Sequence, residues 1–387
     1  MHVFFSAGEP SGDQHGAELM ELLGESAPGA RFSGFGGPDM EAAGLQSLYR
    51  LTDLAVMGFG QVLPMLAKFR GLVKQAEAYL AAERPDAVVL IDFPGFNWWI
   101  AKAAKKAGIP VYFYCPPQLW AWAPWRIRKV RKYVDCILSV LPFEAEWYRQ
   151  RGVDVEYVGH PFFDEVAHHP LDETTLSTIR QRSDRNVALL PGSRKQEVNR
   201  NFPAMLMTIR KLTKKYPEVR FPVACYKEWH FNRCRELLSE AEDLPVDLYL
   251  SKTPEVIEAA DMCYMVSGSV SLELLARRTP AVVMYRGGYI MGNLAKVLVT
   301  CKYMSLPNLI ADRSLFPEFP FMRPTDGIAQ EMADALEQWL GNPWKLAQIK
   351  QELNTLADGI VQAGGVSRAA DVLISRITNS TSQRRAA

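Results

Sequence analysis

The chain has 387 residues, and its 44 Lys and Arg residues nearly balance its 43 Asp and Glu residues, which leaves a formal net charge of +1. This balance argues against a nucleic-acid-binding protein held by bulk positive charge, and the length indicates two domains. The N-terminus lacks a basic region followed by a long apolar run, and no apolar run reaches the roughly 18 residues of a spanning helix, so we expect neither a signal peptide nor a transmembrane segment.

The first elements predicted are a strand, a glycine-containing turn and a helix. Residues 3–5 are apolar, residues 6–13 read Ser-Ala-Gly-Glu-Pro-Ser-Gly-Asp, and the leucines that follow have helical spacing. Residues 30–37 predict a second strand that runs into glycines. Residues 56–80 predict an amphipathic helix with interspersed Lys and Arg, which is either a packed helix or a basic surface for anionic lipid.

A carboxylate follows the clearest buried strand of the first half. Residues 87–91 read Ala-Val-Val-Leu-Ile, and Asp92 comes next. Ligands of α/β proteins bind at the carboxyl ends of parallel strands, where a partly desolvated carboxylate can act as a general base. The alternative is an Asx turn in which Asp92 binds the backbone before Pro94, and both roles can hold together.

Tryptophans and cations are combined after the next strand, which we expect at residues 111–114. Residues 116–132 contain three Trp residues and five Lys or Arg residues. This combination suits base stacking, an acceptor pocket at a membrane interface, or a Trp-rich loop packed on a basic helix, and the near-neutral charge makes base stacking the least favoured. Further strands are expected at residues 136–141 and 155–161, and a polar linker at residues 162–185.

The second half begins as the first does. Residues 187–190 predict a short buried strand, residues 191–194 read Pro-Gly-Ser-Arg, and a helix is expected over residues 202–212. Such a turn gathers backbone N–H groups at the positive end of a helix dipole, which suits a phosphate. Arg194 adds a planar cation that can bind phosphate oxygens with two donors. The alternative is an ordinary strand–helix turn with a surface Arg.

A second turn of this kind follows the strand expected at residues 261–266. Ser267, Gly268 and Ser269 precede a helix, and their hydroxyl and N–H groups can meet a diphosphate. Glu273 lies a turn and a half further, where a carboxylate can accept from both hydroxyls of a ribose. The alternative is a capped helix with a surface Glu, but two such turns in one half favour nucleotide binding.

The other elements expected in the second half are strands at residues 219–225, 246–249 and from 281, a helix at 254–260 capped by Thr253, an irregular stretch at 305–324, helices at 327–357 with a break at 342–343 and at 366–377, and a disordered tail at 378–387.

Eight sequence runs resemble the signature runs of the lipid-A-disaccharide synthase family. They are GEPSGD at residues 8–13, AVMGFGQVL at 55–63, IDFPGFN at 91–97, PPQLWAW at 116–122, GHPFFDE at 159–165, LLPGSRKQEV at 189–198, SGSVSLE at 267–273 and PNLIA at 307–311. The resemblance implies the α/β glycosyltransferase fold called GT-B, with two Rossmann-like, doubly wound parallel-sheet domains that face a central cleft. It also implies an inverting, metal-independent transfer from UDP-2,3-diacylglucosamine to 2,3-diacylglucosamine 1-phosphate (lipid X), which yields the β-1,6-linked lipid A disaccharide 1-phosphate and UDP.

The resemblance also implies roles for individual residues. Asp92 matches the family's essential aspartate and candidate base, Arg194 its essential arginine, and Glu9 with Asp13 its acidic N-terminal motif. We assign catalysis to Asp92, Glu9 and Arg194, donor binding to Gly192, Ser193, Arg194, Ser267, Gly268, Ser269 and Glu273, and acceptor binding to Ser11, Asp13, Asn97, Trp120 and Trp122. The chain departs from the family at Gly95, where many members have a second Asp, and at Pro116, where Ser is more usual. The first change places more weight on Asp92, and the second leaves the shape of the acceptor loop open.

The expected organisation follows from these assignments. Residues 1–165 would bind the acceptor, residues 166–357 would bind the UDP-sugar, and a helix at 358–377 would pack on the first domain or on a partner subunit. We expect no cofactor and no metal, because no DxD, HExxH or Cys/His ligand spacing occurs. Six scattered cysteines indicate reduced thiols in a cytoplasmic protein.

The expected partners follow from the acyl chains of both substrates. These chains imply peripheral contact with the anionic cytoplasmic face of the inner membrane, through residues 56–73 and the Trp-rich loop. No nucleic-acid partner is expected, and a homodimer is left open.

Overall fold

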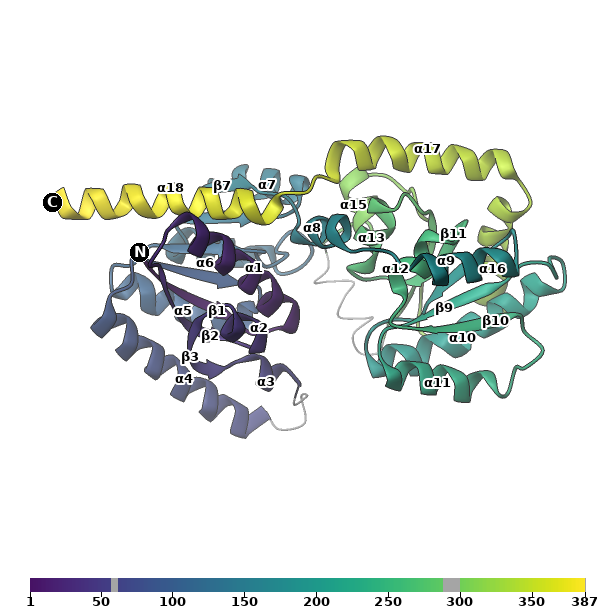
Figure 1. Ribbon diagram of the computed structural model, residues 1–387, viewed down its shortest axis with the longest axis horizontal. Coiled ribbons are helices and arrows are strands. Elements are labelled where there is room, and N and C mark those ends of the chain that lie inside the picture. The colour runs from purple at the N-terminus through teal and green to yellow at the C-terminus, as the bar shows by residue number, and fades with distance from the viewer. Residues whose placement is uncertain (57–61, 288–299, 387) are drawn as a thin grey trace. The chain divides into compact units, whose positions relative to one another are not determined.

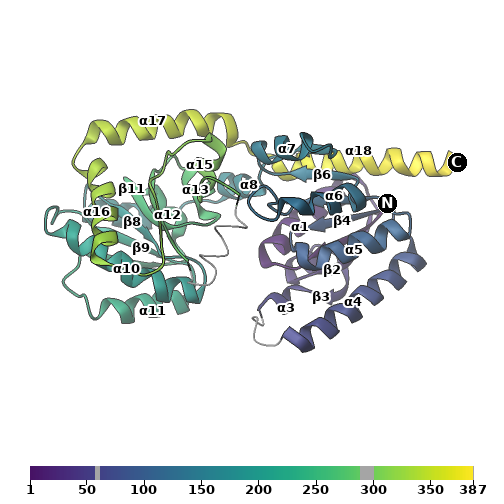
Figure 2. The same cartoon turned by 180° about the vertical axis from the view of Figure 1, so that it is seen from behind.

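The computed structural model describes residues 1–56, 62–287 and 300–386, and Figures 1 and 2 show the chain from two sides. The described residues form two compact units. Unit 1 consists of Met1–Asp164 and Gln362–Ala387, and unit 2 of Glu165–Val361. Each unit is built on a parallel sheet, so the expected pair of Rossmann-like domains is confirmed. The central cleft expected between them stays a prediction.

Within the described residues, unit 1 contains a seven-stranded sheet in the order β3-β2-β1-β4-β5-β6-β7, in which all neighbouring strands are parallel. Its strands are β1 (His2–Ala7), β2 (Arg31–Gly36), β3 (Leu45–Arg50), β4 (Ala87–Ile91), β5 (Val111–Tyr114), β6 (Cys136–Ser139) and β7 (Val155–Tyr157).

Helices cover both faces of this sheet. Figure 1 looks onto α1 and α18, which pack against each other, and Figure 2 shows α4, α5 and α6 on the other side. The helices are α1 (Pro10–Ser26), α2 (Pro38–Ala42), α3 (Thr52–Val56), α4 (Val62–Glu83), α5 (Pro94–Lys106), the 3-10 turn η2 (Pro124–Arg126), α6 (Ile127–Tyr133), α7 (Pro142–Arg149) and α18 (Gly365–Ala386), while α8 (Pro161–His168) spans the boundary between the units.

The burial of β4 explains why the sequence predicted this strand so clearly. All five of its residues are fully buried. Val88 and Leu90 belong to a core cluster with apolar side chains of α4 and α5, whereas Ile91 points toward Gly12 and Gly16 of α1. A strand covered on both faces needs a continuous apolar run rather than an alternating one.

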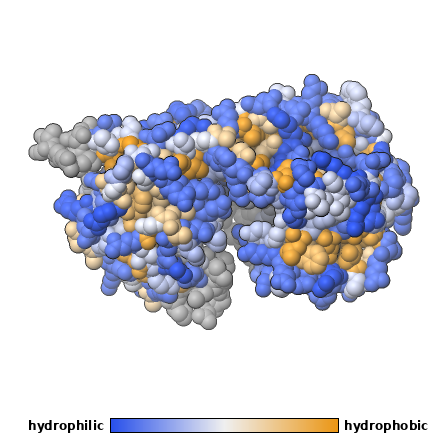
Figure 3. Space-filling view, in the orientation of Figure 1, coloured by the Kyte–Doolittle hydropathy of each residue, from blue (hydrophilic) through white to orange (hydrophobic). Residues whose placement is uncertain are grey.

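Within the described part of unit 2, a six-stranded parallel sheet has the order β10-β9-β8-β11-β12-β13. Its strands are β8 (Val187–Leu190), β9 (Phe221–Cys225), β10 (Val246–Leu250), β11 (Met262–Val266), β12 (Ala281–Arg286) and β13 (Glu318–Phe321). Its helices are α9 (Glu173–Arg182), α10 (Lys195–Thr213), α11 (Glu228–Leu238), α12 (Thr253–Glu258), α13 (Val270–Ala276), α15 (Leu306–Ala311), α16 (Asp326–Leu340) and α17 (Pro343–Ile360). Figure 3 shows a mostly hydrophilic face with apolar residues in small, separate areas.

The strand order reverses at one place in each sheet, and most of the predicted site residues lie on the turns that follow the strands there. β1 has β2 on one side and β4 on the other, and β8 has β9 and β11. The register pairs Ala7 with Ile91, and Leu190 with Met265, so the turns that follow these strands are neighbours at the carboxyl edge of the sheet. Connections leave such a switch point toward opposite faces, which opens the crevice where doubly wound proteins bind ligands.

Four expectations from the sequence were wrong. Residues 162–185 are not an irregular linker, because they contain most of α8 and all of α9, which Asp172 caps by accepting from two backbone N–H groups. Residues 305–324 contain α15 and β13. Thr253 does not cap α12 but is its first residue.

The fourth concerns the tail, where α18 continues through residue 386 instead of ending near Ile377. Across the three described ranges, none of the helices combines the length and the apolar character needed to cross a bilayer.

Candidate active site

Asp92 follows β4 in an unusual backbone conformation. Its φ is 44° and the φ of Phe93 is 45°, in the left-handed region that residues other than glycine seldom adopt. The backbone N–H of Asp92 donates to the carbonyl oxygen of Tyr114 at the end of β5, over 3.4 Å. Strained conformations of this kind cluster at functional sites. The turn at the end of β4 therefore has the backbone strain that is typical of functional sites, and the catalytic role of Asp92 stays a prediction.

The surroundings of the Asp92 side chain shift the pKa of its carboxyl group. Asp92 is only partly exposed, and burial raises the pKa of its carboxyl group, while a hydrogen bond with the backbone of Phe93 acts in the opposite direction. A carboxylate with a raised pKa holds a proton more readily than an exposed aspartate does. Burial, and to a lesser extent Asp92, raise the pKa of the neighbouring Cys115 thiol well above its usual value, so this thiol stays protonated beside the carboxylate.

Glu9 and Ser11 lie on the adjacent turn, after β1. Glu9 is the N-cap residue of α1, has an extended backbone, and makes no capping hydrogen bond with its side chain. Ser11 is exposed in the first turn of the same helix. Both residues lie at the switch point of unit 1, and the roles expected for them from the sequence stay predictions.

Asp13 faces the protein interior. It is 2% exposed, and its Oδ1 accepts from the backbone N–H groups of Gly37 at 2.7 Å and Met40 at 3.1 Å. Its Oδ2 accepts from the N–H of Asp39 at 3.0 Å. The carboxylate thus caps the start of α2, where both a negative charge and hydrogen-bond acceptors are favourable. These contacts give Asp13 a structural role in place of the acceptor binding expected from the sequence.

Asn97 is also turned inward. Its side chain is fully buried on α5, and its Oδ1 accepts from the hydroxyl of Ser6 at 2.6 Å. Its Nδ2 donates to backbone carbonyl oxygens at the ends of β1 and β4. The amide is therefore bonded within the turn, and the expectation that Asn97 binds the acceptor is corrected.

The two candidate tryptophans differ in exposure. Trp120 is 8% exposed, and its indole Nε1–H donates to the Glu144 carboxylate at 3.0 Å. Trp122 is 43% exposed, with the guanidinium of Arg126 over its ring at 4.5 Å. Trp122 therefore presents a ring to the outside, whereas Trp120 offers a ligand little surface.

Glu144 is a buried carboxyl group that the sequence did not single out. It accepts from Trp120 and from the Ser139 hydroxyl at 2.8 Å. Burial raises the pKa of Glu144 to about 7, and these two hydrogen bonds act in the opposite direction. A buried acid with these partners fixes the Trp-rich loop against α7.

In unit 2, the turn after β8 already holds an anionic group. Glu197 Oε2 accepts from the backbone N–H groups of Ser193 at 3.0 Å and Arg194 at 3.1 Å. Gly192 has a φ of +114°, and a Cβ there would lie 2.6 Å from Glu197, so only glycine fits. The N–H groups expected to meet a phosphate are thus bonded to a carboxylate. The Arg194 side chain is 82% exposed and pairs weakly with Glu197 at 3.3 Å, which leaves its guanidinium accessible.

The second turn of unit 2 lies at the end of β11. Gly268 and Ser269 are exposed before α13, and their nucleotide-binding role stays a prediction. Ser267 is partly exposed, and its hydroxyl donates to the Met304 carbonyl oxygen at 2.8 Å. The Ser267 hydroxyl therefore ties this turn to the segment that precedes α15.

Glu273 is not the surface residue of the alternative interpretation. It is 6% exposed, and its Oε1 accepts from Arg277 Nε at 3.0 Å. Burial raises the pKa of Glu273, and the charge of Arg277 lowers it. A ribose-binding role would have to use the other carboxylate oxygen.

Glu318 is a second residue that sequence reasoning missed. Its carboxylate accepts from the backbone N–H groups of Met304 and Ser305, each at 2.8 Å, and from Asn308 Nδ2 at 2.8 Å. It thereby organises the segment that Ser267 contacts. Its sequence neighbourhood gave no signal, and neither did that of Glu197, because the residue three positions before Glu197 is Arg194 and not the Ser or Thr of a capping box.

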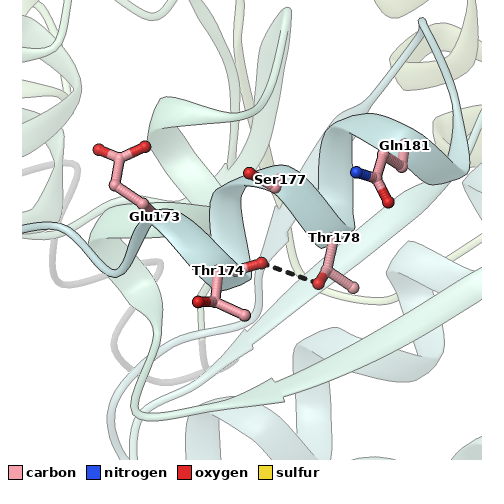
Figure 4. Close-up of a pocket in the computed structure, with 5 residues that line it drawn as sticks. All are labelled: Glu173, Thr174, Ser177, Thr178 and Gln181. Carbon is pink, nitrogen blue, oxygen red and sulfur yellow. Dashed lines mark hydrogen bonds between the residues drawn. The ribbon is translucent and has the colours of Figure 1, made fainter.

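Two further observations concern ligands. Within the described ranges, no group of three or more His, Cys, Asp or Glu side chains is arranged to hold a metal ion. A surface depression on α9 is lined by Glu173, Thr174, Ser177, Thr178 and Gln181 (Figure 4), where the Thr178 hydroxyl donates to the Thr174 carbonyl oxygen. This depression contains none of the predicted site residues.

Comparisons with known proteins agree with the resemblance found in the sequence. The family model described as Lipid-A-disaccharide synthetase matches residues 3–352. A protein named Lipid-A-disaccharide synthase from Syntrophus aciditrophicus (strain SB) is 35% identical over 381 residues, which cover 98% of each chain.

Two solved structures share the fold. The S. aureus MnaA–UDP co-structure has a TM-score of 0.65 at 12% identity and covers 97% of this chain and 96% of that chain. The calicheamicin glycosyltransferase CalG4 has a TM-score of 0.61 at 14% identity and covers 98% of both chains. Likeness at such low identity shows the fold alone, and it confirms the expected GT-B class.

Proposed function

Because the chain belongs to the lipid-A-disaccharide synthase family and is a glycosyltransferase, we propose that it transfers 2,3-diacylglucosamine from UDP-2,3-diacylglucosamine to lipid X. The products would be the β-1,6-linked disaccharide 1-phosphate and UDP. The observation that carries the proposal is the family match over nearly the whole chain, which includes the turns at both switch points.

In the proposed reaction, unit 1 supplies the base. Asp92 takes the proton of the acceptor 6-hydroxyl as this oxygen bonds to the anomeric carbon of the donor. The bond from that carbon to the UDP oxygen breaks, and the electron pair leaves with UDP. One such displacement converts an α-linked donor into a β-linked product. The burial of Asp92 and its raised pKa support this role, and a positioned base contributes about 10²–10⁴-fold to the rate.

Unit 2 would hold the donor and stabilise the leaving group. The accessible guanidinium of Arg194 suits the diphosphate, because it can donate two parallel hydrogen bonds to phosphate oxygens. Gly268 and Ser269 offer backbone N–H and hydroxyl groups at the neighbouring turn. A well-placed donor to developing charge is worth about 3–4 kcal/mol. Glu273 would bind the ribose through the oxygen that does not accept from Arg277 Nε.

We further propose peripheral contact of unit 1 with an anionic membrane surface on the cytoplasmic side. Trp99, Trp122 and Trp125 are 56%, 43% and 57% exposed. They lie on and beside α5 and α6, where Lys102, Lys106, Arg128, Lys129, Arg131 and Lys132 supply positive charge. Exposed tryptophans beside cations suit the interface of an anionic bilayer. The other expected contact, residues 56–73, lies partly outside the described residues.

An assay of UDP release tests the proposed reaction. Purified protein is incubated with UDP-2,3-diacylglucosamine alone, with lipid X added, and with a deacylated acceptor. We expect UDP to be released only when lipid X is present. Turnover of UDP-N-acetylglucosamine without any acyl substrate would instead indicate an epimerase, an activity that proteins of this fold also have.

A further inference from the structure

We propose that Asn97 is a positioning residue that holds Asp92 in the orientation needed for proton transfer. The inference rests on the proposed role of Asp92 as the base, and it replaces the acceptor-binding role that the sequence indicated for Asn97. It is carried by the hydrogen bonds of the buried amide, by the backbone conformation of the turn, and by the packing of Phe93.

The amide of Asn97 joins the ends of two strands. Its Nδ2 donates to the carbonyl oxygens of Asp92 at 2.7 Å, Ser6 at 3.1 Å and Ile91 at 3.2 Å. Its Oδ1 accepts from the Ser6 hydroxyl at 2.6 Å. Three carbonyl oxygens require a donor and the hydroxyl can supply a proton, so the contacts fix which end of the amide is nitrogen. The shortest of the three donations goes to Asp92 itself.

The turn held by this amide is one that the backbone does not favour. Asp92 and Phe93 both have positive φ, although neither is glycine. Left-handed residues that are not glycine persist only where surrounding contacts determine them. With the Asn97 donor removed, the carbonyl groups of Ile91 and Asp92 would lose a buried partner, and the turn could relax toward an ordinary conformation.

Phe93 fixes the same turn from the other side. A Cβ on Gly8 would lie 2.3 Å from Phe93 Cδ1, so the ring rests directly on the glycine backbone. The ring also packs near Phe69 and Phe96, with centroid distances of 6.3 and 6.4 Å. Asn97 therefore holds the backbone of the turn while the Phe93 ring rests on Gly8, and together these contacts fix the direction in which the Cα–Cβ bond of Asp92 leaves the backbone.

A double-mutant cycle separates positioning from a merely structural role. Asn97→Ala is made in the wild type and in Asp92→Asn, and single-turnover rates, the KM for the donor and the Kd for UDP are measured. In the wild type we expect the rate to fall at least about tenfold, with the donor KM and UDP affinity changed less than about twofold. In the Asp92→Asn background the same change should lower the rate less than about twofold, because the group that Asn97 orients is already lost.

Two controls keep the test decisive. Asn232→Ala removes the same amide from an exposed position on α11 and should leave the rate unchanged. If Asn97→Ala does not fold, Ser6→Ala is tested in its place, because it removes only the hydrogen bond to Asn97 Oδ1. The expected loss of rate is then smaller in the wild type and again absent from the Asp92→Asn background. An equal loss in both backgrounds, or no loss in the wild type, would overturn the positioning role. Full activity of Asp92→Asn alone would instead reject the proposed base.

Discussion

Asn97 donates a hydrogen bond from its side chain to the backbone carbonyl oxygen of Asp92, over 2.7 Å. This bond links the first turn of α5 to the residue that follows β4, five positions earlier in the chain. The Asn97 end of this bond is fully buried, whereas Asp92 is partly exposed. The local chain thus carries both the candidate base and the group that fixes its backbone.

Replacement of Asp13 by Ala should reduce the stability of the protein. Three backbone N–H groups at the start of α2 would lose their acceptor, and buried unsatisfied donors cost about 1–3 kcal/mol each. We expect a clear decrease in the midpoint of thermal or urea unfolding. Ser11 lies at an exposed position of α1, the helix that carries Asp13. Ser11→Ala should shift the free energy of unfolding by about 0.5 kcal/mol or less. Equal unfolding midpoints for Asp13→Ala and wild type would contradict the capping role.

Replacement of Arg194 by Ala should affect the donor and leave the fold intact. The side chain is 82% exposed, and surface ion pairs such as that with Glu197 contribute little to stability. We expect UDP affinity to fall about tenfold and the rate to fall about 100-fold or more, as for the loss of a donor to a charged leaving group. Calorimetric titration with UDP and steady-state kinetics check both effects.

Arg194→Lys is the matched control for this change. It keeps the charge but loses the planar pair of donors, so it should recover only part of the UDP affinity. An Arg194→Ala variant with wild-type kinetics would remove Arg194 from the site.

Glu144 should give the protein a pH-dependent component of stability. Folding raises the pKa of Glu144 from 4.5 to about 7, so its proton binds more tightly in the folded state. The resulting stabilisation is complete below about pH 4.5 and is lost as the pH rises through about 7. At pH 8, Glu144→Gln should therefore have a larger free energy of unfolding than the wild type, by at most about 3 kcal/mol, and should unfold at a higher temperature. The difference should shrink toward pH 5.

Thermal unfolding of both proteins between pH 5 and pH 8 measures this effect. Glu146→Gln, on the exposed side of the same helix, is the matched control and should show little dependence of this kind. A difference between Glu144→Gln and wild type that stays constant over the range would show that the carboxyl group does not titrate as inferred.

The exposed tryptophans of unit 1 should support binding to anionic vesicles. We expect wild-type protein to float with vesicles of phosphatidylglycerol and phosphatidylcholine at low salt, and less so at high salt, because charge attraction is screened. The combined change of Trp99, Trp122 and Trp125 to Ala should abolish flotation. Trp344→Ala, at a 71% exposed position on α17 of unit 2, is the control and should float as the wild type does. Wild-type protein that never floats would contradict the membrane contact.

Much of the fold could be predicted because the buried strands end at residues that form sharp turns. Residues 87–91 and 187–190 were predicted as strands, and the structure contains them with the same ends, since Asp92 and Pro191 interrupt the apolar runs. The helices near residues 162–185 were missed because α9 is short and mostly polar, although Asp172 was available as its cap. Local capping can thus stabilise a helix that apolar periodicity does not indicate.

The candidate site was harder to predict than the strands that carry it. Asp92 was singled out because it follows a buried parallel strand, although an Asx turn before Pro94 was an alternative reason for a carboxylate there. Asn97 and Asp13 are polar residues in the same runs, but their side chains satisfy buried backbone groups instead of facing outward. Residue type and spacing do not distinguish these two uses of a polar side chain, because both require the same donors and acceptors.

The most direct test of the account compares wild type and Asp92→Asn by mass spectrometry of the products formed from UDP-2,3-diacylglucosamine and lipid X. We predict that the wild type forms the disaccharide 1-phosphate and UDP, whereas the variant is slower by about 10²–10⁴-fold and binds UDP with near-normal affinity. Disaccharide formation by Asp92→Asn at the wild-type rate, or no disaccharide from the wild type, would contradict the account.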